Sequence, residues 1–181
     1  MSETALWDFA RGSGVVALVL LTMSVFLGVV TRSGRPAPGL PRFAVVAVHR
    51  NVSLVATVFL ALHVILLLFD PYAQLRLFDI VLPFVGDYRP FWQGLGTVAF
   101  DLLIALVVTS LLRHRLGARS WRAIHWAAYA LWPSALLHAL GTGTDSGAPW
   151  FIALAVICVA AVLGALGWRL AKVPARQKVS A

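Results

Sequence analysis

Four histidines in apolar surroundings are the residues of this sequence best suited to chemistry. They form two pairs, with His49 and His63 fourteen positions apart and His125 and His138 thirteen apart. Each pair encloses an almost unbroken apolar run, "HRNVSLVATVFLALH" and "HWAAYALWPSALLH". Imidazole is a common metal ligand, and an ionisable side chain within a membrane segment is a functional candidate by default. The pattern therefore indicates metal or cofactor ligation inside a bilayer.

The spacing within each pair excludes one ion bound by both of its histidines. Fourteen helical residues rise about 21 Å and thirteen about 19.5 Å, whereas a metal–nitrogen bond is about 2 Å long. A ligand must therefore be held between two helices, and the two pairs predict two such sites at different depths. Haem with one axial imidazole from each helix meets both conditions, and it fills the broad apolar space between helices.

The composition places these histidines in a membrane protein. The chain has 181 residues, of which 60% are hydrophobic and 12% charged, and a soluble domain carries about twice that charged fraction. Because lipid offers no water to backbone groups, apolar segments of about 20 residues are expected to cross it as helices. We therefore expect one all-α membrane domain over residues 1–181, a bundle of five transmembrane helices. Its spans are 14–30, 43–69, 91–112, 121–140 and 150–170.

The charges predict how this bundle is oriented. Twelve of the fifteen Lys and Arg residues lie in or beside the connections after the first and third spans and after the fifth span, regions without Asp or Glu. Positive segments stay in the cytoplasm, so we expect the N-terminus outside, the C-terminus inside and a basic cytoplasmic tail at 171–181. The basic surface then faces anionic lipid, and nucleic acid is not an expected partner.

This orientation matches the histidines in depth. The second and fourth spans run in the same direction, which pairs His49 with His125 and His63 with His138. At about 100° per residue, His63 returns to the face of His49, but His125 and His138 point far apart on an ideal helix. Pro133 lies between them, and proline kinks helices. We therefore expect the fourth span to be bent or locally rewound so that both imidazoles face the second span.

Cations near the histidines are candidates for binding the anionic propionates of haem. Arg50 is the best of them, because it adjoins His49 inside a span, where an unpaired arginine costs about 2.5–3.5 kcal/mol. Further candidates are Arg42, Arg119 and Arg122 at the inner side and, more weakly, Arg76, Arg89 and Tyr72 at the outer side.

Asp101 is the only acid within an expected span. Its carboxylate is able to accept the free ring N–H of His63 or His138 and so fix the orientation of the imidazole. A protonated packing residue or part of a proton route are the alternatives. The outer connection 70–90 contains the apolar stretch "LFDIVLPFV", which either caps the bundle or forms a loose interfacial loop.

The sequence resembles the ferric reductase-like transmembrane domain over roughly residues 14–170. The similarity is carried by the two histidine pairs and by "VTSLLRHRLGARSWRAIHWAAYALWPSALLH". This family includes the haem-carrying core of ferric reductases and NADPH oxidases and the MsrQ-related haem subunits. The resemblance implies that His49, His63, His125 and His138 are the axial ligands of two b-type haems.

The resemblance also implies a function. We expect a multi-pass cytochrome of the inner or plasma membrane that carries electrons from a cytoplasmic flavoprotein or quinone to an external acceptor. The sequence lacks the glycine-rich strand–turn–helix motif of a dinucleotide-binding module, so we expect a separate donor and an electron-transfer subunit. Two alternatives remain, a non-redox transporter or assembly subunit with proton-handling histidines, and a quinone-reactive anchor of a larger complex.

Overall fold

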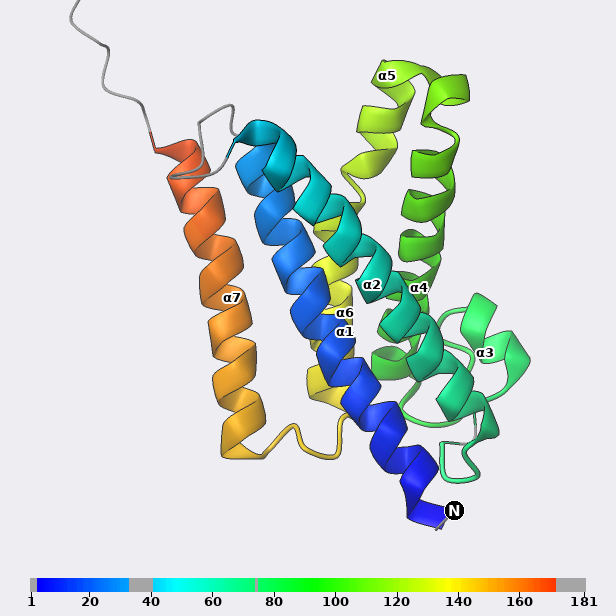
Figure 1. The fold of residues 1–181 in the computed structure, drawn as a ribbon. Helices are drawn as coiled ribbons and strands as arrows, with labels where there is room; N and C mark the ends of the chain where they lie inside the picture. Colours follow the sequence, from blue (N-terminus) through cyan, green and yellow to red (C-terminus); the bar gives the residue numbers. More distant parts are fainter. Residues whose placement is uncertain (1–2, 33–40, 74, 172–181) are drawn as a thin grey trace, which may run out of the picture.

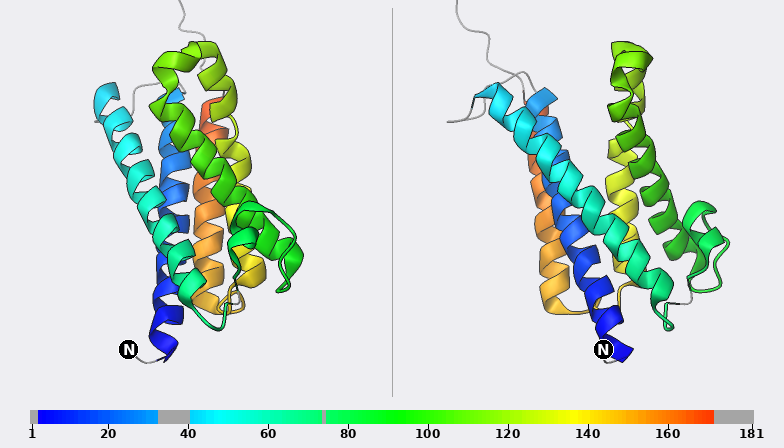
Figure 2. Two further views of the ribbon diagram at one scale, coloured as in Figure 1. Left: turned by 90° about the vertical axis from the view of Figure 1, so that its right-hand side faces the viewer. Right: turned by 45° about the vertical axis from the view of Figure 1, so that its right-hand side comes forward.

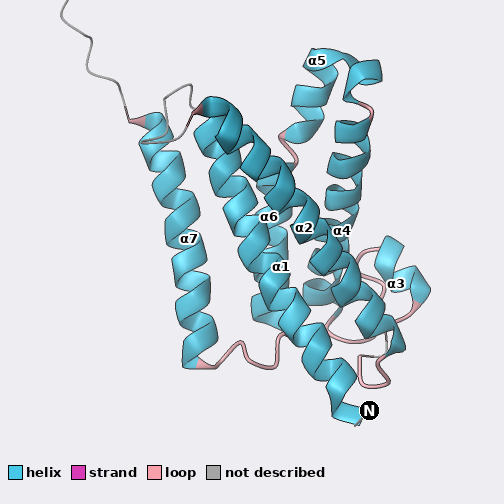
Figure 3. Cartoon of the chain, in the orientation of Figure 1, coloured by secondary structure: helices cyan, strands magenta, loops and turns pink. Residues whose placement is uncertain are grey.

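The computed structural model describes residues 3–32, 41–73 and 75–171, and within these ranges the chain is helical and contains no strand (Figures 1 and 3). The prediction of a basic tail falls, from residue 172 onward, outside the described residues. The helices are α1 (Glu3–Arg32), α2 (Arg42–Phe69), α3 (Leu77–Val81), α4 (Pro90–Leu111), α5 (Arg113–His125), α6 (Ala128–Thr142) and α7 (Pro149–Leu170).

Four of the described helices, α1, α2, α4 and α7, are long and apolar enough to cross a membrane. Large apolar side chains are exposed along them, for example Val58 on α2 and Ile157 on α7, as expected for helices surrounded by lipid. The chain is therefore an all-α, multi-pass membrane protein. The segment expected as one further span, 121–140, is instead divided between α5 and α6.

Four of the helices, α1 with α2 and α4 with α6, form two antiparallel pairs (Figure 2). The helix α1 packs along α2, and α4 packs along α6, while α1 also contacts α6 and α7. A buried hydrogen bond joins the pairs, because Trp132 Nε1 on α6 donates to Thr22 Oγ1 on α1 at 2.9 Å. We call the end of the bundle that carries α3, the N-terminus and the α6–α7 connection the α3 end, and the opposite end the α5 end.

The break between α5 and α6 rewinds the helix as expected for this span. The amides of Trp126, Ala127, Tyr129 and Ala130 bond to carbonyls three residues back, at 2.9–3.2 Å. Such a segment turns by about 120° per residue in place of 100°, so about five residues of it add roughly 100°. That rotation nearly closes the angular gap left by a thirteen-residue spacing. Pro133, which has no N–H to donate to the carbonyl of Tyr129, lies just beyond, inside α6.

The described part of the connection before α4, residues 70–73 and 75–89, forms a cap at the α3 end of the bundle. Asp79 is 7% exposed; its carboxylate accepts the backbone N–H of Arg76 at 2.9 Å, and its carbonyl accepts the hydroxyl of Thr97 on α4 at 2.6 Å. Phe84 adopts a φ of +68° and lies directly against Gly94 of α4. The connection is therefore folded against α4 at this end of the bundle, and its place in the outer membrane interface stays a prediction.

Candidate cofactor sites

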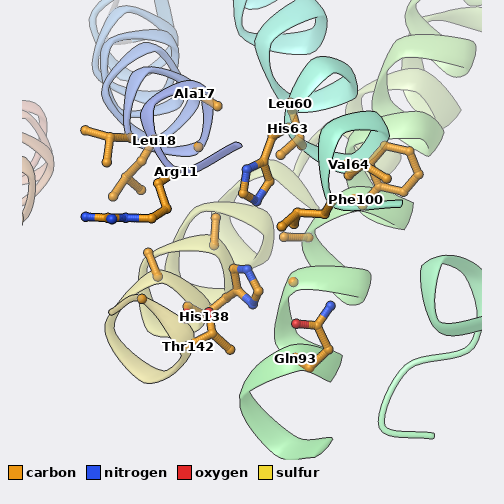
Figure 4. A pocket seen from close by; sticks show the side chains of 18 of the residues that line it. Arg11, Ala17, Leu18, Leu60, His63, Val64, Gln93, Phe100, His138 and Thr142 are labelled. Atoms are coloured by element: carbon orange, nitrogen blue, oxygen red, sulfur yellow. Dashed lines mark hydrogen bonds between the residues drawn. The ribbon is translucent and has the colours of Figure 1, made fainter. Parts of the chain in front are cut away.

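A cavity at the α3 end lies between both helix pairs. It is open to the surroundings and is lined by residues of α1, α2, α4, α6 and the cap. His63 enters it from α2 and His138 from α6, facing each other across the cavity (Figure 4). Leu18, Leu60, Phe100 and Ala135 are among its apolar walls.

Backbone carbonyls of neighbouring helices fix both of these imidazoles. Nδ1 of His63 donates to the carbonyl of Ala10 on α1 at 2.7 Å, and Nδ1 of His138 donates to the carbonyl of Trp92 on α4 at 2.9 Å. A carbonyl oxygen only accepts, so each Nδ1 must carry the proton. The Nε2 atom of each ring is then unprotonated and remains available to bind a metal.

The other two histidines meet near the α5 end. The ring centroids of His49 and His125 are 6.4 Å apart and the ring planes are 81° apart. Two imidazoles on one metal ion have nitrogens about 4 Å apart, and roughly 1 Å from each nitrogen to its ring centre gives about 6 Å. The observed separation therefore fits a metal held between the two rings. Nδ1 of His49 donates to the carbonyl of Ser24 on α1 at 3.0 Å.

The structure thus brings the four histidines together in the two pairs expected from the sequence. The described residues contain no group of three or more His, Cys, Asp or Glu side chains able to hold a metal ion. Each pair therefore offers two protein ligands from opposite sides, which is the donor set of an axially ligated haem and not of a closed four-ligand metal site.

The comparison with known protein families found a match to the chain. A family model described as "Ferric reductase like transmembrane component" matches residues 13–136, more than half of the chain. The chain belongs to this ferric reductase-like family. The match covers α2 with its two histidines, α4 and α5 with His125, and it ends two residues before His138. No curated protein and no solved structure matches the chain.

Membership in the ferric reductase-like family makes the chain a membrane redox component. Domains of this family generally bind haem, and the residues present fit that group. The histidine pairs present nitrogens from opposite sides, and the cavity around His63 and His138 has apolar walls and polar residues near Asp145 at one edge.

Two arginines of α1 that were not among the expected candidates lie close to the histidine pairs. Arg11 of α1 lines the α3-end cavity and forms an ion pair with Asp145. Arg32, at the end of α1, lies 5.2 Å over the ring of Trp126, the neighbour of His125, and has a buried Nη1 without a hydrogen-bond partner.

The arginines singled out earlier lie elsewhere. The side chain of Arg50 is exposed although it adjoins His49 in sequence, and Arg42, Arg119 and Arg122 are exposed as well. Arg76 pairs with Asp87 in the cap at 2.6 Å, Arg89 donates to the carbonyl of Gly141, and Tyr72 is exposed. The expected ranking of these residues followed chain position, whereas proximity to the histidines depends on how α1 packs.

The expected partnership of Asp101 with a histidine is also corrected. The Nδ1 atoms of His63 and His138 are bonded to carbonyls of α1 and α4, so neither donates to the Asp101 carboxylate. Backbone carbonyls of neighbouring helices accept these hydrogen bonds in place of the Asp101 carboxylate.

Proposed function

We propose that the chain is a dihaem b-type membrane cytochrome. In this proposal it is the haem subunit of a reductase system and carries electrons across the membrane from a separate cytoplasmic flavoprotein or quinone to an external acceptor. One observation supports this proposal above all. His49 faces His125 and His63 faces His138, and the two histidines of each pair come from different helices.

In this role the chain supplies ligation, burial and orientation, and the bound haems supply the one-electron redox chemistry. His49, His63, His125 and His138 would hold the haem irons. The carbonyls of Ala10, Ser24 and Trp92 hold three of the rings, and a hydrogen bond to Nδ1–H makes Nε2 a more basic ligand.

Two arginines are suited to the carboxylate edges of the haems. Arg11 lies at the polar edge of the α3-end cavity, and its pairing with Asp145 supports a role in holding an anionic group there. Arg32 has a buried guanidinium nitrogen without a hydrogen-bond partner beside the α5-end pair, and this nitrogen is suited to the same task. Charge-assisted hydrogen bonds of this kind are about twice as strong as neutral ones.

We further propose that α5 and α6 together make a fifth crossing of the inner or plasma membrane, with the α3 end outside and the α5 end in the cytoplasm. The distribution of Lys and Arg supports this orientation. In a Cys158→Ala background, an impermeant maleimide added to intact cells is expected to label Gly147→Cys but to label Ala118→Cys only after lysis. The reverse pattern would refute the orientation.

The experiment that tests the function is a reduced-minus-oxidised absorbance spectrum of the purified protein with a haem-to-chain ratio. We expect a spectrum of six-coordinate, low-spin b-type haem and a ratio of two. A ratio of one would remove one of the two sites from the proposal. A colourless protein would overturn the proposal and favour a transporter or assembly subunit with proton-handling histidines.

A further inference from the structure

Three of the four histidines share one arrangement against the neighbouring helix, in which the ring lies on a backbone carbonyl and beside the glycine four residues later. We call such a carbonyl–glycine combination a glycine seat. The seats are Ala10 and Gly14 for His63, Ser24 and Gly28 for His49, and Trp92 and Gly96 for His138.

The glycine is what allows the imidazole to reach the carbonyl. Residues i and i+4 lie one above the other on a helix face, so a side chain at i+4 stands beside the carbonyl of residue i. A Cβ added to Gly96 would lie 2.5 Å from Nδ1 of His138, and one added to Gly14 would lie 2.8 Å from Cε1 of His63. Both distances are impossible without displacement of the ring. At Gly28 the distance is an ordinary 3.5 Å.

The seats repeat in register with the ligands. Gly14 and Gly28 are fourteen positions apart on α1, the same separation as that of His49 and His63 on the antiparallel α2. Equal spacing lets two antiparallel helices present both seats to both rings.

The helix α4 breaks this repeat at the α5 end. The positions thirteen and fourteen residues after Gly96 are Thr109 and Ser110, not glycine. The hydroxyl of Thr109 already donates to the carbonyls of Ala105, at 2.6 Å, and Leu106, at 3.3 Å, which are the carbonyls thirteen and fourteen residues after Trp92.

His125 therefore has no seat. Its Nδ1 is buried without a hydrogen-bond partner. Its ring stacks on Trp121, with centroids 4.9 Å apart, and the Trp121 indole N–H is directed to the hydroxyl of Ser110 at 3.4 Å. Stacking fixes the plane of the His125 ring, but no hydrogen bond to Nδ1 selects its tautomer, whereas a seated ring is fixed in both orientation and tautomer.

We propose that the three glycine seats are positioning devices that present Nε2 of His49, His63 and His138 to the cofactors, and that His125 is the one adjustable ligand. This inference rests on the proposed function for the identity of the cofactor. It makes the two sites unequal, because the α3-end site has two seated ligands and the α5-end site has one. The α5-end haem is accordingly the one that exchanges more readily.

The first test compares glycine variants. Loss of a supporting contact to a metal ligand typically weakens metal binding by about 10–100-fold. Gly96→Ala and Gly14→Ala are expected to weaken haem retention at the α3-end site by this factor and to change the midpoint potential and electron paramagnetic resonance signal of that haem alone. Gly12→Ala, with nothing within 4 Å of its Cβ, is the matched control on α1 and is expected to behave as wild type.

A second measurement needs no haem. Nitrogen-15 spectra of the histidine rings in cofactor-free protein are expected to show the Nδ1–H tautomer for His49, His63 and His138 and both tautomers for His125. Transfer of haem to apomyoglobin is expected to empty the α5-end site first, with the sites assigned by His125→Ala and His138→Ala.

The outcomes separate the inference from the proposed function. If Gly96→Ala and Gly14→Ala keep wild-type haem retention, midpoint potentials and resonance signals, the positioning role of the glycine seats is refuted. The proposed function as a dihaem cytochrome is not affected by that result. A seated tautomer for His125, or equal haem loss from both sites, would overturn its role as the adjustable ligand. Protein that shows the three seated tautomers but takes up no haem would overturn the function and leave the seats as structural devices.

Discussion

Replacing His138 with alanine is expected to lower the haem content from two to one per chain. The substitution removes one of the two nitrogens that face each other across the α3-end cavity and leaves His63 as a single ligand on one side. The pair of His49 and His125, at the other end of the bundle, keeps its 6.4 Å ring separation. The remaining haem is therefore expected to retain the six-coordinate, low-spin spectrum.

The measurement is the haem-to-chain ratio together with the electron paramagnetic resonance spectrum of the oxidised protein. His114→Ala is the matched control, because His114 is exposed on α5 and contacts Arg113, outside either pair. His49→Ala is expected to give the complementary result, with the α3-end haem retained. Two haems with unchanged spectra in His138→Ala would show that His138 is not an axial ligand.

Replacing Gly94 with alanine is expected to displace the cap from the α3 end. A Cβ at this position would lie 2.2 Å from the ring of Phe84 and 2.6 Å from its backbone nitrogen. The strain cannot be relieved by rotating the side chain alone, because the backbone of Phe84 is also in the way. Overpacking of this kind costs about 1–3 kcal/mol, and Phe84 already holds an unfavourable positive φ.

Hydrogen–deuterium exchange in residues 75–89 is expected to rise in this variant, and the thermal midpoint of the protein to fall. Gly86→Ala is a control within the same cap, because its Cβ would make only an ordinary 3.5 Å contact with Asp79. Equal exchange and equal midpoints in the two variants would show that the cap does not depend on the close approach at Gly94.

The depth and pairing of the histidines could be predicted from sequence because they follow from simple regularities. The rise per residue and the one-sided distribution of cations are enough to place His49 level with His125 and His63 level with His138. The need to rewind the fourth span also followed from the thirteen-residue spacing. The place of the rewinding could not be predicted, because the amides that bond to carbonyls three residues back extend from Trp126 to Ala130 and so precede the proline.

The supporting groups could not be predicted in the same way, because they depend on packing between helices. In the sequence, Arg11 and Arg32 are ordinary charges at the ends of an apolar segment. Only the packing of α1 against both α2 and α6 brings them close to the histidines. A signal for the helix backbone was nonetheless present. Gly14 and Gly28 repeat the separation of His49 and His63, and equal spacings on two successive spans mark the faces that meet.

The hydrogen bonds from α1 to both rings of α2 have a mechanical consequence. The carbonyls of Ala10 and Ser24 are fourteen residues apart, about 21 Å along one continuous helix, and each holds a histidine of the same partner helix. A slide of α1 along α2 changes both contacts at once and in the same direction. A displacement of α1 at one end of the bundle is therefore transmitted to the histidine ring near the other end as well.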